Sequence, residues 1–238
     1  MTDRPILFSA PMVKALLAGK KTQTRRVLKP QVITGRLDDS TPYFSWGGFT
    51  GIFPDDWFGQ GNSIDGALPY APGDRLWVKE AHFLTDNGDA DCVVYAADED
   101  AVEAHRRNID DLKRRFPGTH WDRHLRLRPS IHMPKWASRI TLVVTDVRVQ
   151  RVQEISVDDA IAEGIDLEDT HAGDFSEAER LIAAGGTCGC RHPEIYPFRK
   201  LWNSINADRG YGWDQNPWVV AISFTVHKQN IDAMRDAV

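Results

Sequence analysis

Cysteine is scarce in this sequence of 238 residues, and long apolar runs are missing from it. The three cysteines, Cys92, Cys188 and Cys190, are odd in number and too few for a disulfide framework, so reduced thiols in a cytoplasmic protein are expected. No apolar stretch approaches the roughly eighteen residues of a membrane-spanning helix, so no membrane association is expected. The opening residues, MTDRPILFSAP, have neither a basic start nor a long apolar segment, which argues against a secretory signal.

Several signature motifs of catalytic and metal sites are also absent. The sequence holds no glycine-rich phosphate loop, no H-E-x-x-H, no G-x-S-x-G and no paired C-x-x-C. Cys188, Cys190 and His192 lie close together, but a zinc site normally takes four ligands, and only Cys92 or His171 could complete this one. A surface loop with reduced thiols is the favoured interpretation. Neither a metal nor a cofactor is therefore expected.

The charge of the chain is unevenly distributed. The composition, 42% hydrophobic and 26% charged, is typical of a globular protein, and the formal net charge is −5. Residues 14–36 nevertheless contain seven Lys or Arg and no Asp or Glu, and residues 106–128 contain eight Lys or Arg against three Asp. Local positive potential attracts polyanions, so the stretch 14–36 is equally well explained as a binding site for a phosphorylated ligand or as a solvated charged face. For the helical part, 106–115, a solvated face is favoured.

Alternation and capping signals predict several short strands and few helices. Strands are expected at 6–9, 75–83, 92–96, 139–152 and 218–226, and helices at 10–17, 98–116 and 157–163. This balance favours an α+β, mainly β fold with a β-barrel or sandwich core over a βαβ sheet. No internal repeat or linker is found. One domain over 1–238 is expected, with insertions at about 35–70, 86–128 and 166–194.

A dense cluster of cations and hydroxyls follows the first expected helix, at residues 20–26. In an extended segment, Lys21, Gln23 and Arg25 point to one side and Thr24 to the other, unless a bend at Thr22 brings Lys21 and Thr24 together. Neighbouring cations lower one another's pKa, so one lysine of the cluster can be neutral and serve as a base. A threonine hydroxyl within its reach would then be an activated nucleophile. The alternative is a basic turn that simply contacts phosphate.

Two glutamates occupy unusual positions. Glu163 ends the helix that begins after Ser156, and the helix dipole disfavours a carboxylate there unless a cation compensates. Such a glutamate is either exposed and mildly unfavourable, or placed to donate a proton or to pair with a lysine. Glu80 shares an expected strand face with Leu76 and Val78, so it is either inward and paired or at the end of the strand.

These segments resemble the ASCH superfamily of PUA-like small β-barrels. The resemblance rests on LAGKKTQTRR at 17–26, which is similar to the family signature G-x-K-x-x-x-x-R, on GDRLWV at 73–78 and on AIAEG at 160–164. The segments PSIHMPKWASRI at 129–140 and NPWVV at 216–220 resemble a subfamily common in phages and prophages. The resemblance implies a PUA-like (ASCH) β-barrel flanked by short helices, with the long insertions outside it.

The resemblance also implies a cleft that handles RNA or a modified nucleoside. One small ASCH branch, similar over residues 17–26, hydrolyses the acetyl amide of N4-acetylcytidine without a metal, and its catalytic residues would fall on Lys21, Thr24 and Glu163. The family arginine would fall on Arg26, facing phosphate, ribose or a developing oxyanion. Further candidates for substrate binding are Lys20, Glu80 and a base-stacking Trp77 or Trp136, although either tryptophan can instead belong to the core.

Three functions remain open at this point. The first is an amidohydrolase acting on an N4-acylated cytidine or a similar modified nucleoside. The second is a module that binds RNA or a modified base without chemistry, with the two basic stretches adjacent in space. The third is a ribonuclease for single-stranded RNA that uses the same cleft. The expected partner is accordingly a modified nucleoside or single-stranded RNA.

Overall fold

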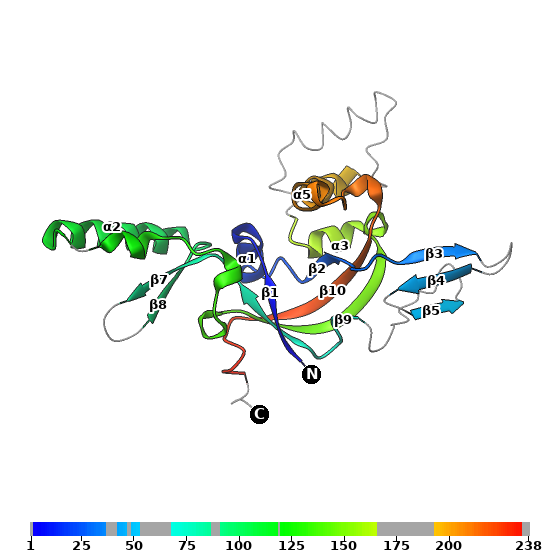
Figure 1. Ribbon diagram of the computed structural model, residues 1–238, viewed down its shortest axis with the longest axis horizontal. Helices are drawn as coiled ribbons and strands as arrows, with labels where there is room; N and C mark the ends of the chain where they lie inside the picture. The colour runs from blue at the N-terminus through cyan, green and yellow to red at the C-terminus, as the bar shows by residue number, and fades with distance from the viewer. Residues whose placement is uncertain are drawn as a thin grey trace, which may run out of the picture. The chain divides into compact units, whose positions relative to one another are not determined.

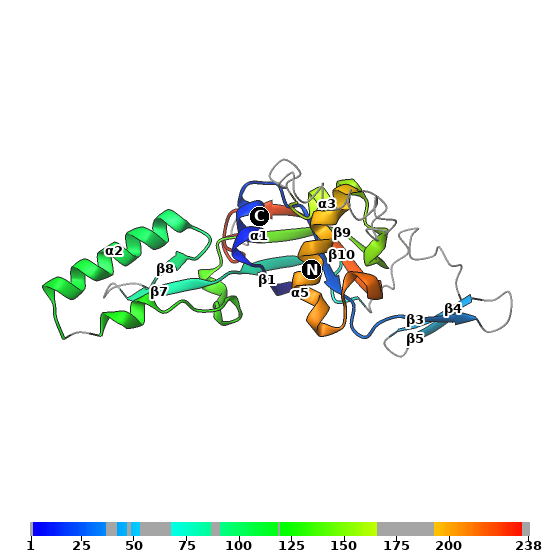
Figure 2. The same ribbon diagram turned by 90° about the horizontal axis from the view of Figure 1, so that it is seen from above.

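The computed structural model describes residues 2–36, 42–46, 49–52, 68–86, 91–118, 120–165 and 193–234. Figures 1 and 2 show the chain in two perpendicular views. Cys188, Cys190, His171 and His192 lie outside the described residues, and so does most of the expected insertion at 166–194. In the part of the chain that is described, no helix is both long enough and apolar enough to span a membrane.

Most of the expected elements are confirmed. The strands are β1 (Asp3–Leu7), β2 (Gln23–Val27), β3 (Ile33–Arg36), β4 (Pro42–Trp46), β5 (Phe49–Ile52), β6 (Arg75–Lys79), β7 (His82–Asp86), β8 (Asp91–Tyr95), β9 (Thr141–Arg151) and β10 (Trp218–His227). The α-helices are α1 (Ala10–Leu17), α2 (Glu99–Arg115), α3 (Val157–Ala162) and α5 (Tyr196–Asn206). Short 3-10 turns connect them, among them η2 (Trp121–Leu125), η3 (Ser130–His132) and η4 (Lys135–Ala137).

The single strand expected over 75–83 is wrong. It divides into β6 and β7, which belong to different sheets. The break falls at Glu80, whose backbone N–H donates to the sulfur of Met133 at 3.2 Å instead of to a neighbouring strand. The backbone N–H of His82 then donates to the carbonyl of Arg128 at 3.1 Å, so the chain leaves one set of strand partners for another.

The largest sheet has the strand order β1-β6-β9-β10-β2. Strand β1 runs parallel to β6, whereas β6 with β9, and β10 with β2, pair antiparallel. A three-stranded sheet β3-β4-β5 and a hairpin β7-β8 complete the pairing. The architecture is thus mixed α and β with few helices. The closed barrel expected from the sequence is not found among the described strands.

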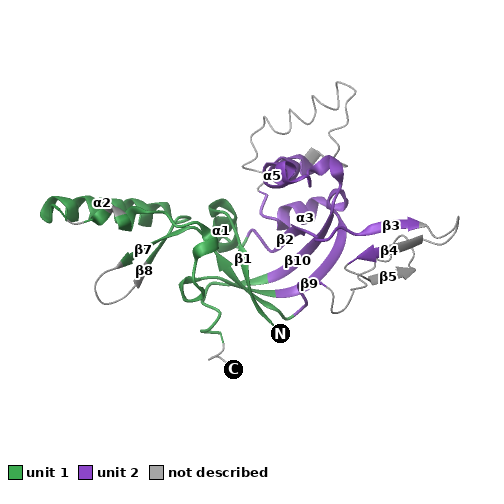
Figure 3. Cartoon of the chain, in the orientation of Figure 1, with its two compact units in different colours: residues 1–19, 73–143, 225–238 green, residues 20–72, 144–224 purple. Residues whose placement is uncertain are grey.

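The described chain forms two compact units, coloured in Figure 3. Unit 1 comprises residues 1–19, 73–143 and 225–238, and unit 2 comprises 20–72 and 144–224. Each unit therefore brings together segments that are far apart in the sequence. Of the candidate residues, unit 2 contains Lys20, Lys21, Thr24, Arg26 and Glu163, and unit 1 contains Trp77, Glu80 and Trp136.

In unit 1, α1 and strands β6 and β9 each contribute fully buried apolar side chains. A proline in the first turn of α1 fits there because its missing N–H would be unpaired anyway, and Gly19, with φ of +73°, ends the segment. Val13 and Leu16 of α1 are fully buried, as are Leu76 of β6 and Leu142 of β9. The long helix α2 lies alongside the β7-β8 hairpin, as both views show.

Unit 2 has an apolar core that fixes its helices over β2 and β10. Buried side chains come from α3 and the turn before it, from α5 and η8 (Trp213–Gln215), and from β10; they are Val152, Ile155, Ala160, Ile195, Phe198, Trp202, Trp213 and Val219. Val27 of β2 packs against this core. The core therefore anchors β2, which contains Thr24 and follows Lys21, and α3, which ends just before Glu163 (Figure 1).

Candidate functional site

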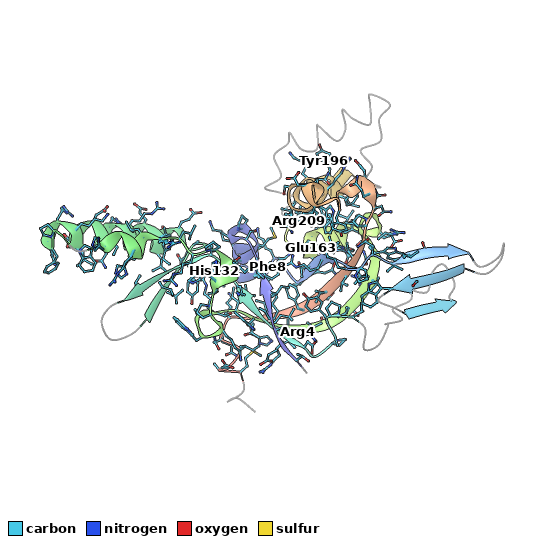
Figure 4. The ribbon with its side chains drawn as sticks, viewed as in Figure 1. Arg4, Phe8, His132, Glu163, Tyr196 and Arg209 are labelled. Carbon is cyan, nitrogen blue, oxygen red and sulfur yellow. The ribbon has the colours of Figure 1, made fainter. Side chains whose placement is uncertain are left out.

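Local hydrogen bonds and backbone conformation define both ends of α3. The Ser156 hydroxyl accepts a hydrogen bond from the backbone N–H of Asp159 at 3.1 Å, which satisfies one of the free donors of the first turn. The helix closes at Glu163, whose backbone is still helical, and Gly164 follows with φ of +88°. Glu163 is labelled in Figure 4. Its carboxylate and its carbonyl are both presented by the last turn of a short, firmly capped helix.

The segment before β2 pairs directly with this helix end. Lys21 and Glu163 form an isolated antiparallel bridge, and the Thr22 backbone N–H donates to the Ala162 carbonyl at 2.8 Å. On its other side, the Thr22 carbonyl accepts from the N–H of Phe224 at 2.9 Å. Backbone hydrogen bonds on both sides thus fix the position of Lys21 relative to Glu163.

The Lys21 amine lies against Glu163 in the protein interior. Its Nζ donates to the Glu163 carboxylate oxygen Oε2 at 2.8 Å and to the Glu163 carbonyl oxygen at 2.6 Å. Lys21 is 1% exposed and Glu163 is 5% exposed. The amine therefore supplies the cation that a carboxylate at a helix C-terminus needs, and it also caps a free carbonyl of the helix.

The surroundings of Lys21 lower the pKa of its amine. Burial lowers the pKa of the Lys21 amine, and although Glu163 opposes this effect, the neighbouring Arg26 and Arg25 lower the pKa further. A lysine whose pKa is depressed by burial and by like charges is the usual form of a lysine base. The arrangement can thus hold an amine that accepts a proton while its position stays fixed by Glu163.

Arg25 contacts the other oxygen of the Glu163 carboxylate. Its Nη1 lies 3.2 Å from Oε1 of Glu163 and donates to Oε1 of Gln23 at 2.6 Å. Its Nη2 donates to Asp159 at 2.6 Å, and Arg148 reaches the other oxygen of Asp159 at 3.2 Å. Although burial acts to raise it, the pKa of Asp159 is held below its usual range by these two guanidinium groups.

Cations outnumber carboxylates around Glu163. Burial lowers the pKa of Arg26, against the attraction of Glu163 and Tyr70, but a guanidinium stays protonated throughout the accessible pH range. With Lys21 protonated, four cationic side chains, Lys21, Arg25, Arg26 and Arg148, lie among three carboxylates, those of Glu163, Asp159 and Asp146, the last of which pairs with Arg148. The single excess positive charge then depends on the protonated Lys21, and it favours a ligand that develops an oxyanion.

Thr24 is buried but is not joined to this network. It is 2% exposed and pairs across the sheet with Ile222 of β10. Because successive residues of a strand face opposite sides, Thr24 lies on the face opposite to Gln23 and Arg25. Among the described residues, no hydrogen bond links its hydroxyl to Lys21 or to Glu163. The side chains of β2 therefore alternate between the two faces of the sheet from Gln23 onward, as expected for an extended segment.

Glu80 is inward and paired, in unit 1. It is 1% exposed, and its two carboxylate oxygens accept from Nε and Nη2 of Arg139 at 2.9 and 3.0 Å. The guanidinium of Arg139 also lies over the ring of Tyr95, 3.8 Å from its centroid. Burial raises the pKa of Glu80, although Arg139 opposes the effect.

The remaining candidates differ in exposure. Trp136 is 51% exposed, so it is not a core residue of unit 1. Trp77 is half-buried, and the ammonium of Lys79 lies 5.3 Å from its ring centroid. Lys20 is exposed in unit 2. The structure brings Lys21 and Glu163 into contact, with Arg26 close enough to influence both electrostatically, and it leaves Trp77, Glu80 and Trp136 in the other unit.

Sequence reasoning missed three participants, Arg25, Arg148 and Asp159. Arg25 had a usable signal, because strand alternation places it on the same side as Lys21. Asp159 stands three residues after Ser156, as the acidic residue of a capping box does, which gives no hint of a role in the site, and Arg148 lies on β9 with no signal of its own. No group of three or more His, Cys, Asp or Glu within the described residues is arranged to hold a metal ion. The proposed cysteine loop at 188–192 lies outside them.

Comparison with known proteins does not assign a function to this chain. No protein-family model matches the chain, and no curated protein matches it. Among solved structures, it is similar to the crystal structure of an ASCH domain from Lactobacillus crispatus JV V101, with 13% sequence identity and a TM-score of 0.33. The similarity covers 94% of this chain and 79% of that one. A TM-score of this size does not establish a shared fold, so function is argued from the site itself.

Proposed function

We propose that this chain is a metal-independent amidohydrolase that acts on an N4-acylated cytidine or a similar modified nucleoside. The observation that carries the proposal is the buried contact between Lys21 and Glu163, because it fixes an amine of lowered pKa within a cationic site. An amine with these properties is suited to general base catalysis. The resemblance of residues 17–26 to the ASCH branch that hydrolyses N4-acetylcytidine supports the choice of substrate.

The proposed reaction proceeds in two halves. The hydroxyl of Thr24 attacks the carbonyl carbon of the acyl amide, and the neutral amine of Lys21 takes the hydroxyl proton. The C–N bond then breaks, the Lys21 ammonium returns the proton to the departing N4 amine, and an acyl ester remains on Thr24. Water hydrolyses this ester, which releases the carboxylic acid and restores the hydroxyl.

Two further residues have proposed roles in this reaction. Glu163 orients the Lys21 amine through its carboxylate and its carbonyl. Arg26 stabilises the oxyanion of the tetrahedral intermediate or binds a phosphate or ribose oxygen. Lys21 becomes cationic when it takes the proton, at the moment when the oxyanion forms, and this positive charge supports the oxyanion role.

The nucleophile is the part of the proposal that most needs a test. Thr24 makes no hydrogen bond with Lys21, so the reaction requires the two to meet when substrate is bound. Catalytic hydrogen bonds are often absent from free enzymes and form only in the complex. Thr24→Val removes the hydroxyl and retains the branched shape, so its effect on activity reports the nucleophile without opening a large cavity.

The direct experiment is incubation of the full chain with N4-acetylcytidine, followed by measurement of acetate and cytidine. Wild-type protein is expected to release both, with and without EDTA, and Lys21→Ala and Thr24→Val are each expected to lose at least about a hundredfold in rate. Lys228→Ala, which removes an exposed lysine of unit 1, is the matched control and should retain activity. No acetate at high enzyme concentration would eliminate the amidohydrolase.

A second candidate is a module that binds RNA or a modified base without chemistry. The specific observation in its favour is that Thr24 lies outside the ionic network, while the cationic side chains remain suited to phosphate. Binding of a single-stranded RNA oligonucleotide should then weaken steeply as salt increases, because each neutralised phosphate releases counterions. Salt-dependent binding and intact RNA, with no release of acetate, would establish this alternative over hydrolase and ribonuclease.

A further inference from the structure

A chain of alternating charges leads from the surface of unit 2 to the Lys21 amine. Each member lies within ion-pair distance of the next; in order, the members are Asp146, Arg148, Asp159, Arg25, Glu163 and Lys21. The N···O distances along the chain are 3.4, 3.2, 2.6, 3.2 and 2.8 Å. The first member is exposed, whereas the last three are buried. Asp159 and Arg25 lie in the middle of this chain, and neither takes part in the proposed reaction.

Arg25 divides its guanidinium between two carboxylates. Its Nη2 donates to Asp159 at 2.6 Å and its Nη1 donates to Oε1 of Gln23 at 2.6 Å. The same Nη1 lies 3.2 Å from Oε1 of Glu163, which is the longest of these three contacts. A guanidinium frequently binds one carboxylate through two parallel hydrogen bonds, but Arg25 gives Glu163 only one nitrogen. The position of Arg25 is therefore set by Asp159 and Gln23 more than by Glu163.

This division leaves one oxygen of Glu163 to the amine. Oε2 of Glu163, which Arg25 does not contact, accepts from Nζ of Lys21 at 2.8 Å. A guanidinium released from Asp159 is able to turn both of its Nη atoms to Glu163 and to compete for Oε2. Although burial acts to raise it, Arg25 and Arg148 hold the pKa of Asp159 below its usual range. Asp159 therefore stays ionised at neutral pH and keeps its hold on Arg25.

We propose that Asp159 is a positioning residue: by holding the Arg25 guanidinium, it prevents Arg25 from taking Oε2 of Glu163. That oxygen then remains bound to the Lys21 amine and keeps the amine in one place. Asp159 acts through Arg25 and does not itself contact substrate. The proposal rests on the proposed function in one respect, since it takes Lys21 as the base; the contacts themselves are present without substrate.

Two substitutions should change the pKa of Lys21 in opposite directions. Burial lowers this pKa, and Glu163 opposes the effect. In Asp159→Asn, Arg25 is expected to turn to Glu163 and weaken this opposition, so the pKa should fall. Arg25→Met removes a cation that lowers the pKa and leaves Glu163 to the amine, so the pKa should rise. Arg26, which also lowers it, is the same in both variants. A merely structural role gives no such reversal, because both substitutions would then loosen the same helix end.

The test is a pH titration of the Lys21 side-chain signals by NMR, in the full chain labelled at lysine and without substrate. Lys21→Arg identifies the signals by their absence. Compared with the wild type, the midpoint should move to lower pH in Asp159→Asn and to higher pH in Arg25→Met. Asp158→Asn is the matched control, because it removes an exposed carboxylate from the same turn of α3, and it should leave the midpoint nearly unchanged. No shift in Asp159→Asn, or an equal shift in Asp158→Asn, would overturn the proposal.

A double variant separates positioning from the direct effect of the Asp159 charge. In the Arg25→Met background, Asp159→Asn should move the Lys21 midpoint much less than in the wild type, because the side chain through which Asp159 acts is gone. An undiminished shift would mean that Asp159 acts on the amine through its field alone, and the positioning role would be wrong. A crystal structure of Asp159→Asn decides the same point directly. Both Nη atoms of Arg25 on Glu163 would support the proposal, and an unmoved Arg25 would refute it.

Arg148→Met is the variant to use if Asp159→Asn does not fold, since it changes a partly exposed side chain. It leaves Asp159 entirely to Arg25, so the Lys21 midpoint should move to higher pH, and an unchanged midpoint would count against the proposal. Failure of the proposed function is a separate outcome. Absence of acetate release eliminates the amidohydrolase but leaves the titration as it is. An active enzyme whose Lys21 midpoint ignores Asp159→Asn keeps the proposed function and loses the positioning role.

Discussion

Arg25 and Glu163 are 138 residues apart in the sequence, and Nη1 of Arg25 lies 3.2 Å from Oε1 of Glu163 in a buried cluster. The other carboxylate oxygen is bound by Lys21. One carboxylate thus orients the proposed base and holds the end of α3 against β2. The cluster has a structural role in addition to its proposed chemical one.

The structural role predicts a large effect of Arg25→Met. The substitution keeps an apolar stem but leaves the buried carboxylate of Glu163 and the half-buried carboxylate of Asp159 with fewer cations. Breaking buried pairs of this kind typically costs about 3–5 kcal/mol of unfolding free energy. Urea denaturation should show a loss in this range.

An exposed arginine provides the matched control for Arg25→Met. Arg114 pairs with Asp111 on the surface of α2, and its side chain is 77% exposed. Arg114→Met should cost less than about 1 kcal/mol, because water already screens that pair. Similar losses in the two variants would show that the Arg25 contacts contribute no more than a surface ion pair.

The rate at which the protein hydrolyses N4-acetylcytidine should increase with pH, because the proposed base Lys21 must be neutral. Burial lowers the pKa of Lys21, so the neutral amine required for proton abstraction forms at a lower pH than in an exposed lysine. The rate with N4-acetylcytidine should therefore rise with pH through this lowered pKa and then level off. Lys21→Arg should remove the rising limb, because arginine does not lose its proton. A rate that falls across the same range would contradict lysine as the base.

Glu80 should make stability fall as pH rises above about 4.5. Burial raises the pKa of Glu80 in the folded protein, so between the unfolded and folded pKa values the folded state binds more protons. Unfolding free energy then decreases with increasing pH across that window. Glu80→Gln cannot titrate and should remove this decrease.

Urea denaturation at a series of pH values would measure the Glu80 effect. Glu103→Gln, on the exposed surface of α2, is the matched control and should keep the wild-type profile. If the profile of Glu80→Gln follows that of the wild type, Glu80 is not the residue that titrates in this range.

Two tryptophans should differ strongly in their contribution to stability. Trp136 is 51% exposed in unit 1, whereas Trp213 is 1% exposed and packs edge-on against Phe198, with ring centroids 6.2 Å apart. Trp213→Ala should cost about 3–5 kcal/mol of unfolding free energy, as expected for a buried aromatic. Trp136→Ala should cost less than about 1 kcal/mol. An equally large loss for Trp136→Ala would mean that its side chain is covered in solution.

Local features of the fold followed from local patterns. The helix expected over 98–116 corresponds to α2, and the strand expected over 218–226 corresponds to β10. The Ser156 cap predicted the start of α3, because its hydroxyl and the first-turn N–H are only three residues apart. The strand expected over 75–83 failed, because Glu80 hydrogen-bonds to Met133, which lies 53 residues away.

The candidate site was predictable only in part. The sequence alone placed Lys21 and Arg25 on one side of an extended segment, since side-chain alternation is a property of neighbouring residues. It also placed Glu163 at a helix end. Only the tertiary structure decided that this carboxylate is shared by Lys21 and Arg25, and that Asp159 and Arg148 join them, because these contacts connect residues brought together by packing. The lowered pKa of Lys21 belongs to the same category, since burial depends on which segments cover the amine and not on the residues beside it in the chain.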